Sequence, residues 1–96
     1  MFESSIAPVR DRLIAAGVRQ LGLFGSFARG AANEQSDVDV LVTFYPQSRT
    51  FDNLYAVGEA LEQAFNRKVD LVTDDALSPY LGPKIRSEVK YVDLTG

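Results

Sequence analysis

Two carboxylates, Asp37 and Asp39, lie two residues apart in an otherwise apolar stretch of the chain. On a β-strand, residues i and i+2 share a face, so these side chains are predicted to project together from Cα atoms about 6 to 7 Å apart. Like charges beside a core require protonation, basic partners or a cation, and two carboxylates suit Mg²⁺. The pattern therefore indicates a magnesium site. The alternative is that Asp37 caps the preceding loop and Asp39 faces water at a strand end.

A glycine and a serine, Gly25 and Ser26, follow the first predicted strand. A glycine lets the backbone approach a ligand, the amides of a following helix face anions, and Ser26 adds a hydroxyl donor. Gly-Ser is also a common turn pair, which is the structural alternative. Ten residues separate Ser26 from Asp37, enough for a short helix and a return to the same edge. The spacing favours a phosphate-binding turn beside the acid pair.

A third acid, Asp70, lies within another apolar segment, between Val69 and Leu71. If this strand neighbours the second one, Asp70 completes a cluster of three carboxylates and can accept a proton from an attacking hydroxyl. Alternatively, Asp70 is a strand-edge residue that pairs with Lys68 or Arg67.

The remaining polar candidates lie close to these three features. Arg29 follows Ser26 by one helical turn, so its guanidinium can reach a phosphate; in the alternative it lies in solvent or pairs with Glu34. Asp74 and Asp75 come after the third predicted strand, where we expect them to serve a turn or a helix cap rather than to bind a metal.

The elements that must position these residues follow from hydrophobic periodicity and turn residues. Helices are predicted over residues 5–16, 51–65 and about 78–88, with a helical turn at 27–29, and strands over 19–24, 38–44, 68–73 and 89–94. Thr50 is the predicted N-cap of the longest helix, whose Phe51, Tyr55 and Phe65 are predicted to pack in the core. The order predicts one α+β domain over residues 1–96, a small mixed β-sheet with helices packed mainly on one face.

The composition excludes several classes of protein and site. The 96 residues, 46% hydrophobic and 24% charged, fit one compact domain. The absence of Cys and His excludes the usual zinc sites, a thiol nucleophile, a Ser-His pair and disulfides, so oxygens must hold any metal. A net charge of -3 argues against non-specific nucleic-acid binding. No window approaches the roughly 20 apolar residues of a membrane span, and no secretory signal is found. We expect a cytoplasmic protein without membrane or direct nucleic-acid contacts.

The three chemical features occur in an order typical of one family. Gly25 and Ser26 come first, Asp37 and Asp39 follow after about ten residues, and Asp70 lies on a later strand. With their neighbours at 23–30, 36–42 and 69–72, they resemble the minimal nucleotidyltransferases of the DNA polymerase β-like superfamily. The resemblance implies the polymerase β-like nucleotidyltransferase fold and an enzyme that transfers a nucleotide from ATP to an acceptor hydroxyl.

The same resemblance implies a role for each site residue. Two Mg²⁺ ions are expected, bridged by Asp37 and Asp39, with Asp70 binding one ion and assisting deprotonation of the acceptor. Gly25 and Ser26 are expected to hold the triphosphate of ATP. Arg29 is expected to assist them.

Small members of this family resemble antitoxins encoded beside a HEPN ribonuclease, a helical toxin of the higher-eukaryote and prokaryote nucleotide-binding type. The resemblance implies AMP transfer to a Tyr hydroxyl of that toxin and a hetero-oligomer with it. A chain of 96 residues also leaves no second domain to hold a small acceptor. One alternative is neutralisation by occlusion, with Phe44, Tyr45, Tyr80 and Leu81 as a contact surface. Another is transfer to a small molecule or an RNA end.

Overall fold

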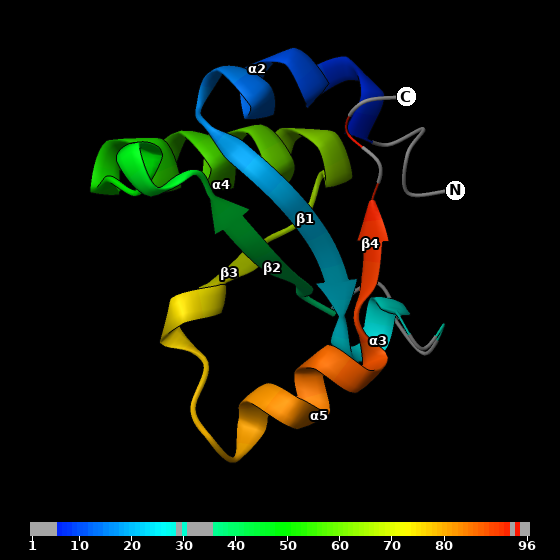
Figure 1. Ribbon diagram of the computed structural model, residues 1–96. Helices are drawn as coiled ribbons and strands as arrows, with labels where there is room; N and C mark the ends of the chain where they lie inside the picture. Colours follow the sequence, from blue (N-terminus) through cyan, green and yellow to red (C-terminus); the bar gives the residue numbers. More distant parts are fainter. Residues whose placement is uncertain (1–5, 29, 31–35, 93, 95–96) are drawn as a thin grey trace.

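A four-stranded mixed sheet forms the centre of the computed structural model, which describes residues 6–28, 30, 36–92 and 94 (Figure 1). The strands lie in the order β3-β2-β1-β4. Their bounds are β1 Val18–Phe24, β2 Val38–Phe44, β3 Val69–Thr73 and β4 Lys90–Val92. β1 runs antiparallel to both β2 and β4, whereas β2 and β3 are parallel. The predicted mixed sheet is confirmed, and β2 occupies a central place in it.

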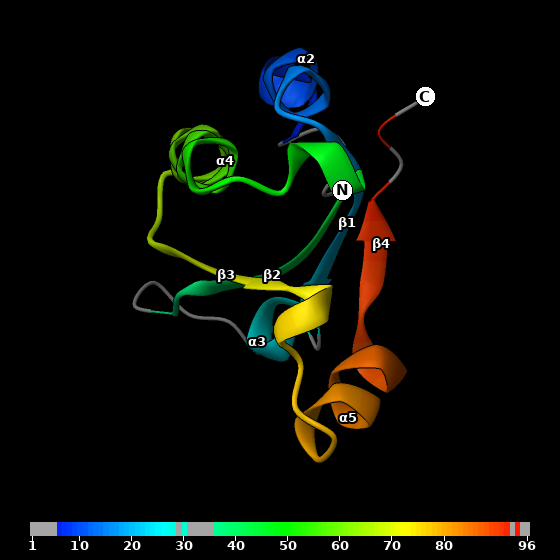
Figure 2. The same cartoon turned by 60° about the vertical axis from the view of Figure 1, so that its left-hand side comes forward.

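Helices lie on both sides of this sheet. They are α2 Arg10–Ala15, α3 Gly25–Ala28, α4 Phe51–Phe65 and α5 Leu81–Glu88, with 3-10 turns η1 Ala7–Val9, η2 Pro46–Ser48 and η3 Asp74–Ala76. Figure 2 shows α2 and α4 together on one side, whereas α3 and α5 lie on the other side. The helical part of the core comes from the α2 and α4 side, in line with the prediction that helices pack mainly on one face, and the shorter α3 and α5 lie on the other face. None of the described helices is long and apolar enough to cross a membrane.

Alternation along β2 separates the core face of the sheet from a second face. Val38, Val40 and Val42 are completely buried beneath α2 and α4. On the other face of β2, Asp39 and Thr43 are half-buried, and Leu41 between them is buried. Leu61 of α4 is also fully buried in this core. No polar or charged side chain is buried anywhere in the described part of the chain, so the core is held by apolar packing alone.

The ends of the helices follow the local chemistry of the sequence. Thr50 caps α4 as predicted, because its hydroxyl oxygen accepts a hydrogen bond from the N–H of Asn53 at 3.1 Å. The first helix begins as the 3-10 turn that contains Pro8 and ends before Gly17, whose φ of 83° is left-handed.

The last helix begins three residues later than predicted, at Leu81 instead of Ser78. A helix that began at Ser78 would hold Pro83 in its second turn, where the missing N–H removes a hydrogen bond. A start at Leu81 places Pro83 in the first turn, where backbone N–H groups have no helical partner anyway.

The aromatic residues of α4 do not pack as predicted. Phe51 is 80% exposed and Tyr55 61% exposed, so the expectation that both lie in the core is wrong; Phe65 does pack against it. The buried face of the helix carries Val57 and Leu61. At about 100° per residue, Phe51 and Tyr55 point well away from that face. Their exposure leaves an apolar surface on the outer side of α4.

Candidate active site

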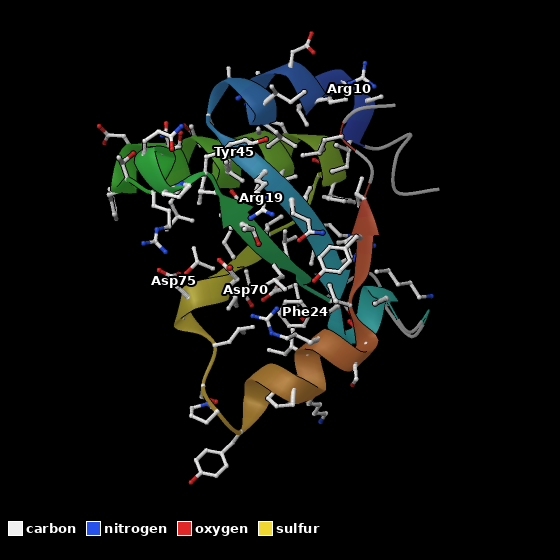
Figure 3. The ribbon with its side chains drawn as sticks, in the orientation of Figure 1. Arg10, Arg19, Phe24, Tyr45, Asp70 and Asp75 are labelled. Atoms are coloured by element: carbon white, nitrogen blue, oxygen red, sulfur yellow. The ribbon has the colours of Figure 1, made fainter. Side chains whose placement is uncertain are left out.

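Three residues from three adjacent strands lie in one row across the sheet. Phe24 is the antiparallel register partner of Asp39 on β2, and Asp39 is the parallel register partner of Asp70 on β3. Register partners project to the same face of a sheet. The two acids therefore share the face opposite α2 and α4, where Figure 3 shows Asp70 and Phe24 on the side toward α5. The second and third strands are therefore neighbours, which is the condition under which Asp70 was expected to join the acid pair.

Asp37 lies two residues before Asp39, directly ahead of β2, and is half-buried. Two backbone contacts fix this approach to the strand. The N–H of Val38 donates to the carbonyl of Lys68 at 3.0 Å, and the guanidinium of Arg67 donates to the carbonyl of Ser36 at 3.2 Å. The chain therefore enters β2 with Asp37 and Asp39 on alternate positions next to the start of β3.

Position 25 requires a glycine because of its backbone conformation and because of a neighbouring side chain. Its φ of 71° is left-handed, a region that favours glycine. A Cβ at this position would also collide with a carboxylate oxygen of Asp39 and lie 3.1 Å from its Cγ. The Asp39 side chain thus packs directly against the glycine turn. The predicted meeting of this turn with the acid pair holds for Gly25 and Asp39.

Glu88, at the end of α5, is a site residue that sequence reasoning did not identify. Its carboxylate oxygen accepts a hydrogen bond from the N–H of Gly25 at 3.3 Å. The contact joins residues 63 positions apart, so no local sequence pattern predicts it. It arises because α5 packs back toward α3. The glycine N–H is thereby seen to hold an anionic oxygen, which is what a phosphate-binding turn must do.

The three acids are not arranged as a finished metal cage. Asp37 and Asp39 are half-buried and Asp70 is exposed. Within the described residues, no group of three or more acidic side chains is placed to hold a metal ion. The donor set nevertheless fits Mg²⁺, because it offers carboxylate oxygens on one face and solvent access for the waters that Mg²⁺ retains.

Ser26, the other member of the predicted phosphate-binding turn, is half-buried within α3, directly after Gly25. α3 begins at Gly25, two residues before the predicted helical turn. Arg29 and its alternative partner Glu34 lie outside the described residues. Their predicted roles therefore stay predictions.

The two acids after β3 serve a turn, as predicted, since Asp74 and Asp75 form η3. The carboxylate of Asp75 pairs with the guanidinium of Arg49 at 2.9 Å. A hydrogen bond from the Thr73 side chain lowers the pKa of Asp75 below its ordinary value, and the Arg49 charge adds to this effect. Because the pKa is lowered on folding, the stabilisation is present above about pH 4 and is lost as the pH falls through the folded-state value.

The contact surface considered for occlusion is only partly available. Phe44 is 5% exposed and belongs to the core, so it cannot serve a partner. Tyr45 and Tyr80 are exposed, at 49% and 90%. Leu81 begins α5. The four residues therefore do not form one exposed apolar surface, because Phe44 points into the sheet's core face.

Comparison with known proteins finds a family profile and several related chains. The family profile described as "Nucleotidyltransferase domain" matches residues 6–92. Protein adenylyltransferase MntA from Thermococcus cleftensis is 42% identical over 78 residues, which cover 79% of this chain and 76% of the relative. A solved structure provisionally named a minimal nucleotidyltransferase superposes with a TM-score of 0.74 and 31% identity, covering 91% of this chain and 92% of that one.

Two more distant solved structures share the fold. A toxin-antitoxin structure with AMP-PNP has a TM-score of 0.72 at 23% identity, covering 95% of this chain and 72% of that chain. A complex of tri-AMPylated Shewanella oneidensis HEPN toxin with MNT antitoxin has a TM-score of 0.56 at 19% identity, covering 88% of this chain and 69% of that chain. At these identities the likeness concerns the fold alone.

Proposed function

The chain belongs to the nucleotidyltransferase family, as a minimal nucleotidyltransferase related to the MntA antitoxins, and we propose that it is itself a protein adenylyltransferase antitoxin. In this proposal it transfers AMP from ATP to a Tyr hydroxyl of a HEPN-type toxin. The names of the MntA relative and of the AMPylated toxin complex support the choice of AMP and of a protein acceptor.

The observation that carries the proposal is the contact between the glycine turn and the acid row. The Asp39 carboxylate packs against Gly25, and Asp70 is the next residue in the same row. In this proposal, the group that binds phosphate and the group that binds the cation are therefore neighbours on one face of the sheet. Nucleotidyl transfer needs this combination, because its catalysis consists largely of positioning and charge stabilisation.

Asp37, Asp39 and Asp70 are the residues that would hold Mg²⁺ in this proposal, and two ions are expected. When bound, Mg²⁺ supplies charge neutralisation for the triphosphate and for the developing pyrophosphate. Gly25 and Ser26 bind the phosphates. A phosphate oxygen at the N–H of Gly25 takes the place of the Glu88 carboxylate, which holds that N–H in this structure.

The transfer step exchanges a phosphoanhydride bond of ATP for a phosphoester bond to the acceptor. The acceptor oxygen forms a bond to the α-phosphorus of ATP, the bond from that phosphorus to the bridging oxygen breaks, and pyrophosphate leaves with the bonding electrons. The proton of the acceptor hydroxyl passes to a carboxylate oxygen of Asp70 and then to water. Asp70 suits this role because it is exposed at the outer strand of the row.

The test of this proposal compares two acid-to-amide variants. Purified chain, Mg²⁺, labelled ATP and the partner toxin are incubated, and labelled toxin is counted. Asp39→Asn should lower the transfer rate by about 100-fold or more, the loss typical of removing one electrostatic group from an active site. Asp11→Asn is the matched control, since Asp11 is an exposed acid on α2, on the opposite side of the sheet. It should transfer label at the parental rate.

Neutralisation in cells distinguishes catalysis from occlusion. If Asp39→Asn loses transfer and also fails to protect cells from the toxin, modification is the mode of neutralisation. If the same variant loses transfer but protects undiminished, the chain neutralises by covering its partner. If it transfers AMP as well as the parent, the assignment of the acid row is wrong.

A further inference from the structure

The outer edge of β3 has no strand beside it in the described part of the chain. β3 ends the strand order, so it pairs with β2 on one side only. An unpaired edge offers a row of backbone donors and acceptors to an extended segment of another chain. In Figure 1, this edge is the one that faces away from β1 and β4.

The backbone groups available on this edge can be assigned from the hydrogen-bond pattern. The N–H of Val38 donates to the carbonyl of Lys68. In a parallel ladder, the backbone N–H and C=O groups of residues 68, 70 and 72 therefore point toward β2. The backbone groups of residues 69, 71 and 73 therefore point outward, away from β2. The N–H of Val69 confirms this phase, because it is held by the Glu62 carboxylate of α4 at 3.3 Å. The N–H and C=O groups of Leu71 and the N–H of Thr73 are the outward groups that a partner strand can use, since the carbonyl of Thr73 begins η3 as its N-cap.

A groove runs along this edge between β3 and α4. It has a volume of about 420 Å³ and is lined mainly by apolar groups, including Phe51, Leu54, Tyr55 and Leu71. The helix lies close to the strand at Gly58, where a Cβ would be in ordinary van der Waals contact with Leu71 at 3.4 Å. The exposed Phe51 and Tyr55 that the core does not use belong to this groove.

The charge of the groove favours a basic partner over a second copy of this chain. Its lining contains Glu59 and Glu62 and no basic residue. Pairing two copies through their β3 edges would bring four of these carboxylates into one apolar cleft, which like-charge repulsion disfavours. Lys or Arg side chains of a different protein complement the same rim.

We propose that the outer edge of β3, together with this groove, docks an extended segment of the protein substrate as a fifth strand. This inference rests on the proposed function. The segment carries a hydroxyl residue, with apolar residues on both sides of it and a basic residue opposite Glu59. Backbone hydrogen bonds to Leu71 and Thr73 supply affinity, and the groove supplies selectivity.

The pairing of an added strand with β3 decides which of its side chains reaches the acid row. An added strand lies about 4.8 Å from β3 and alternates its side chains as β3 does. The residue opposite Asp70 then projects to the acid face, as the next member of the row formed by Phe24, Asp39 and Asp70. Its two neighbours project to the other face, where the groove over Val69 and Leu71 receives them. The docked segment thereby presents its hydroxyl beside Asp70.

Amide hydrogen exchange of the ¹⁵N-labelled chain tests the added strand directly. The probe is a synthetic peptide in which a Tyr is flanked by two Val residues and then by Lys residues, added at millimolar concentration. We expect the amides of Leu71 and Thr73 to exchange at least tenfold more slowly with the peptide than without it. A peptide with Glu in place of each Lys should protect them less. Unchanged exchange at both amides would overturn the proposal.

Steady-state kinetics with the same peptide supply a second test. Glu59→Lys and Phe51→Ala change exposed side chains of the groove, away from the acid row. Each should raise the KM for the peptide about tenfold while leaving the KM for ATP unchanged. Asp11→Lys, an equal charge reversal on the exposed side of α2, is the matched control and should change neither constant. Equal peptide KM values for Glu59→Lys and the parent would contradict the docking mode.

The outcomes separate this inference from the proposed function. If AMP transfer to the toxin depends on Asp39 but the peptide does not protect the amides of Leu71 and Thr73 from exchange, the docking mode is wrong and the proposed function stands. Protection of the two amides that grows with the concentration of the chain itself, without peptide, would assign the edge to a second copy and overturn the proposal.

Discussion

Gly25 shows how one residue can be constrained from two directions. Its left-handed φ is a requirement of the backbone, and the Asp39 carboxylate against its Cα is a requirement of the site. The glycine was identified from sequence as a turn that lets a ligand approach. The close neighbour is the Asp39 carboxylate from the next strand, a contact that no local sequence pattern predicts.

Gly25→Ala and Gly30→Ala separate the two constraints. Both glycines have a φ of 71°, but nothing lies within 4 Å of a Cβ at Gly30. Gly30→Ala should therefore cost only left-handed strain, about 1 to 2 kcal/mol, and keep most activity. Gly25→Ala should cost about 1 kcal/mol more and lower AMP transfer about 100-fold, because Asp39 must move.

Urea unfolding and labelled-ATP transfer measure these two effects. Equal losses of activity in the two variants would show that backbone strain, and not the position of Asp39, limits transfer. Equal stability losses with unequal activity would still place the Asp39 contact in the site.

At the scale of elements, the sequence predicted the positions of α4 and β3 correctly, but it did not predict which side chains of α4 are exposed. Periodicity found the buried face that includes Val57 and Leu61, and turn chemistry found the cap at Thr50. Periodicity cannot tell how far a sheet extends beneath a helix. The exposure of Phe51 and Tyr55 depends on β3 being the last strand, which is decided by strand order.

Thr50→Ala tests the cap of α4. Loss of the hydroxyl leaves the N–H of Asn53 without its acceptor, so the free energy of unfolding should fall by about 1 kcal/mol. Thr50→Ser keeps an oxygen at the same position and should remain within a few tenths of a kcal/mol of the parent. The midpoint of urea unfolding measures the change, with the slope expected to stay constant. A loss of equal size in both variants would assign the effect to the methyl group and not to the cap.

At the scale of the whole molecule, the core and the site are electrostatically separate. Every fully buried side chain in the described part of the chain is apolar, whereas the acids lie half-buried or exposed on the other face. Mg²⁺ therefore serves the site in our proposal and is not needed to fold the chain.

Thermal unfolding checks this separation. EDTA should leave the Tm of the free chain unchanged while abolishing AMP transfer. Mg²⁺ with a non-hydrolysable ATP analogue at about 100 times its Kd should stabilise the parent by about 2.7 kcal/mol, or roughly 10 °C or more for a domain of this size. Asp39→Asn should show no such rise. A lower Tm in EDTA alone would mean that a metal ion is structural.

The sequence alone determined the α+β class, the order and approximate bounds of the elements, and the face that Asp37 and Asp39 share, because these depend on periodicity and on neighbouring residues. The start of α5 also depended on local chemistry, since Pro83 permits only a first-turn position. Tertiary structure decided which acids meet. Asp39 is brought beside Asp70 and against Gly25 by pairing between distant strands, and Glu88 reaches that glycine through the packing of α5. Contacts across the sheet depend on strand order and register, which the free energy of the whole fold selects and no local spacing encodes.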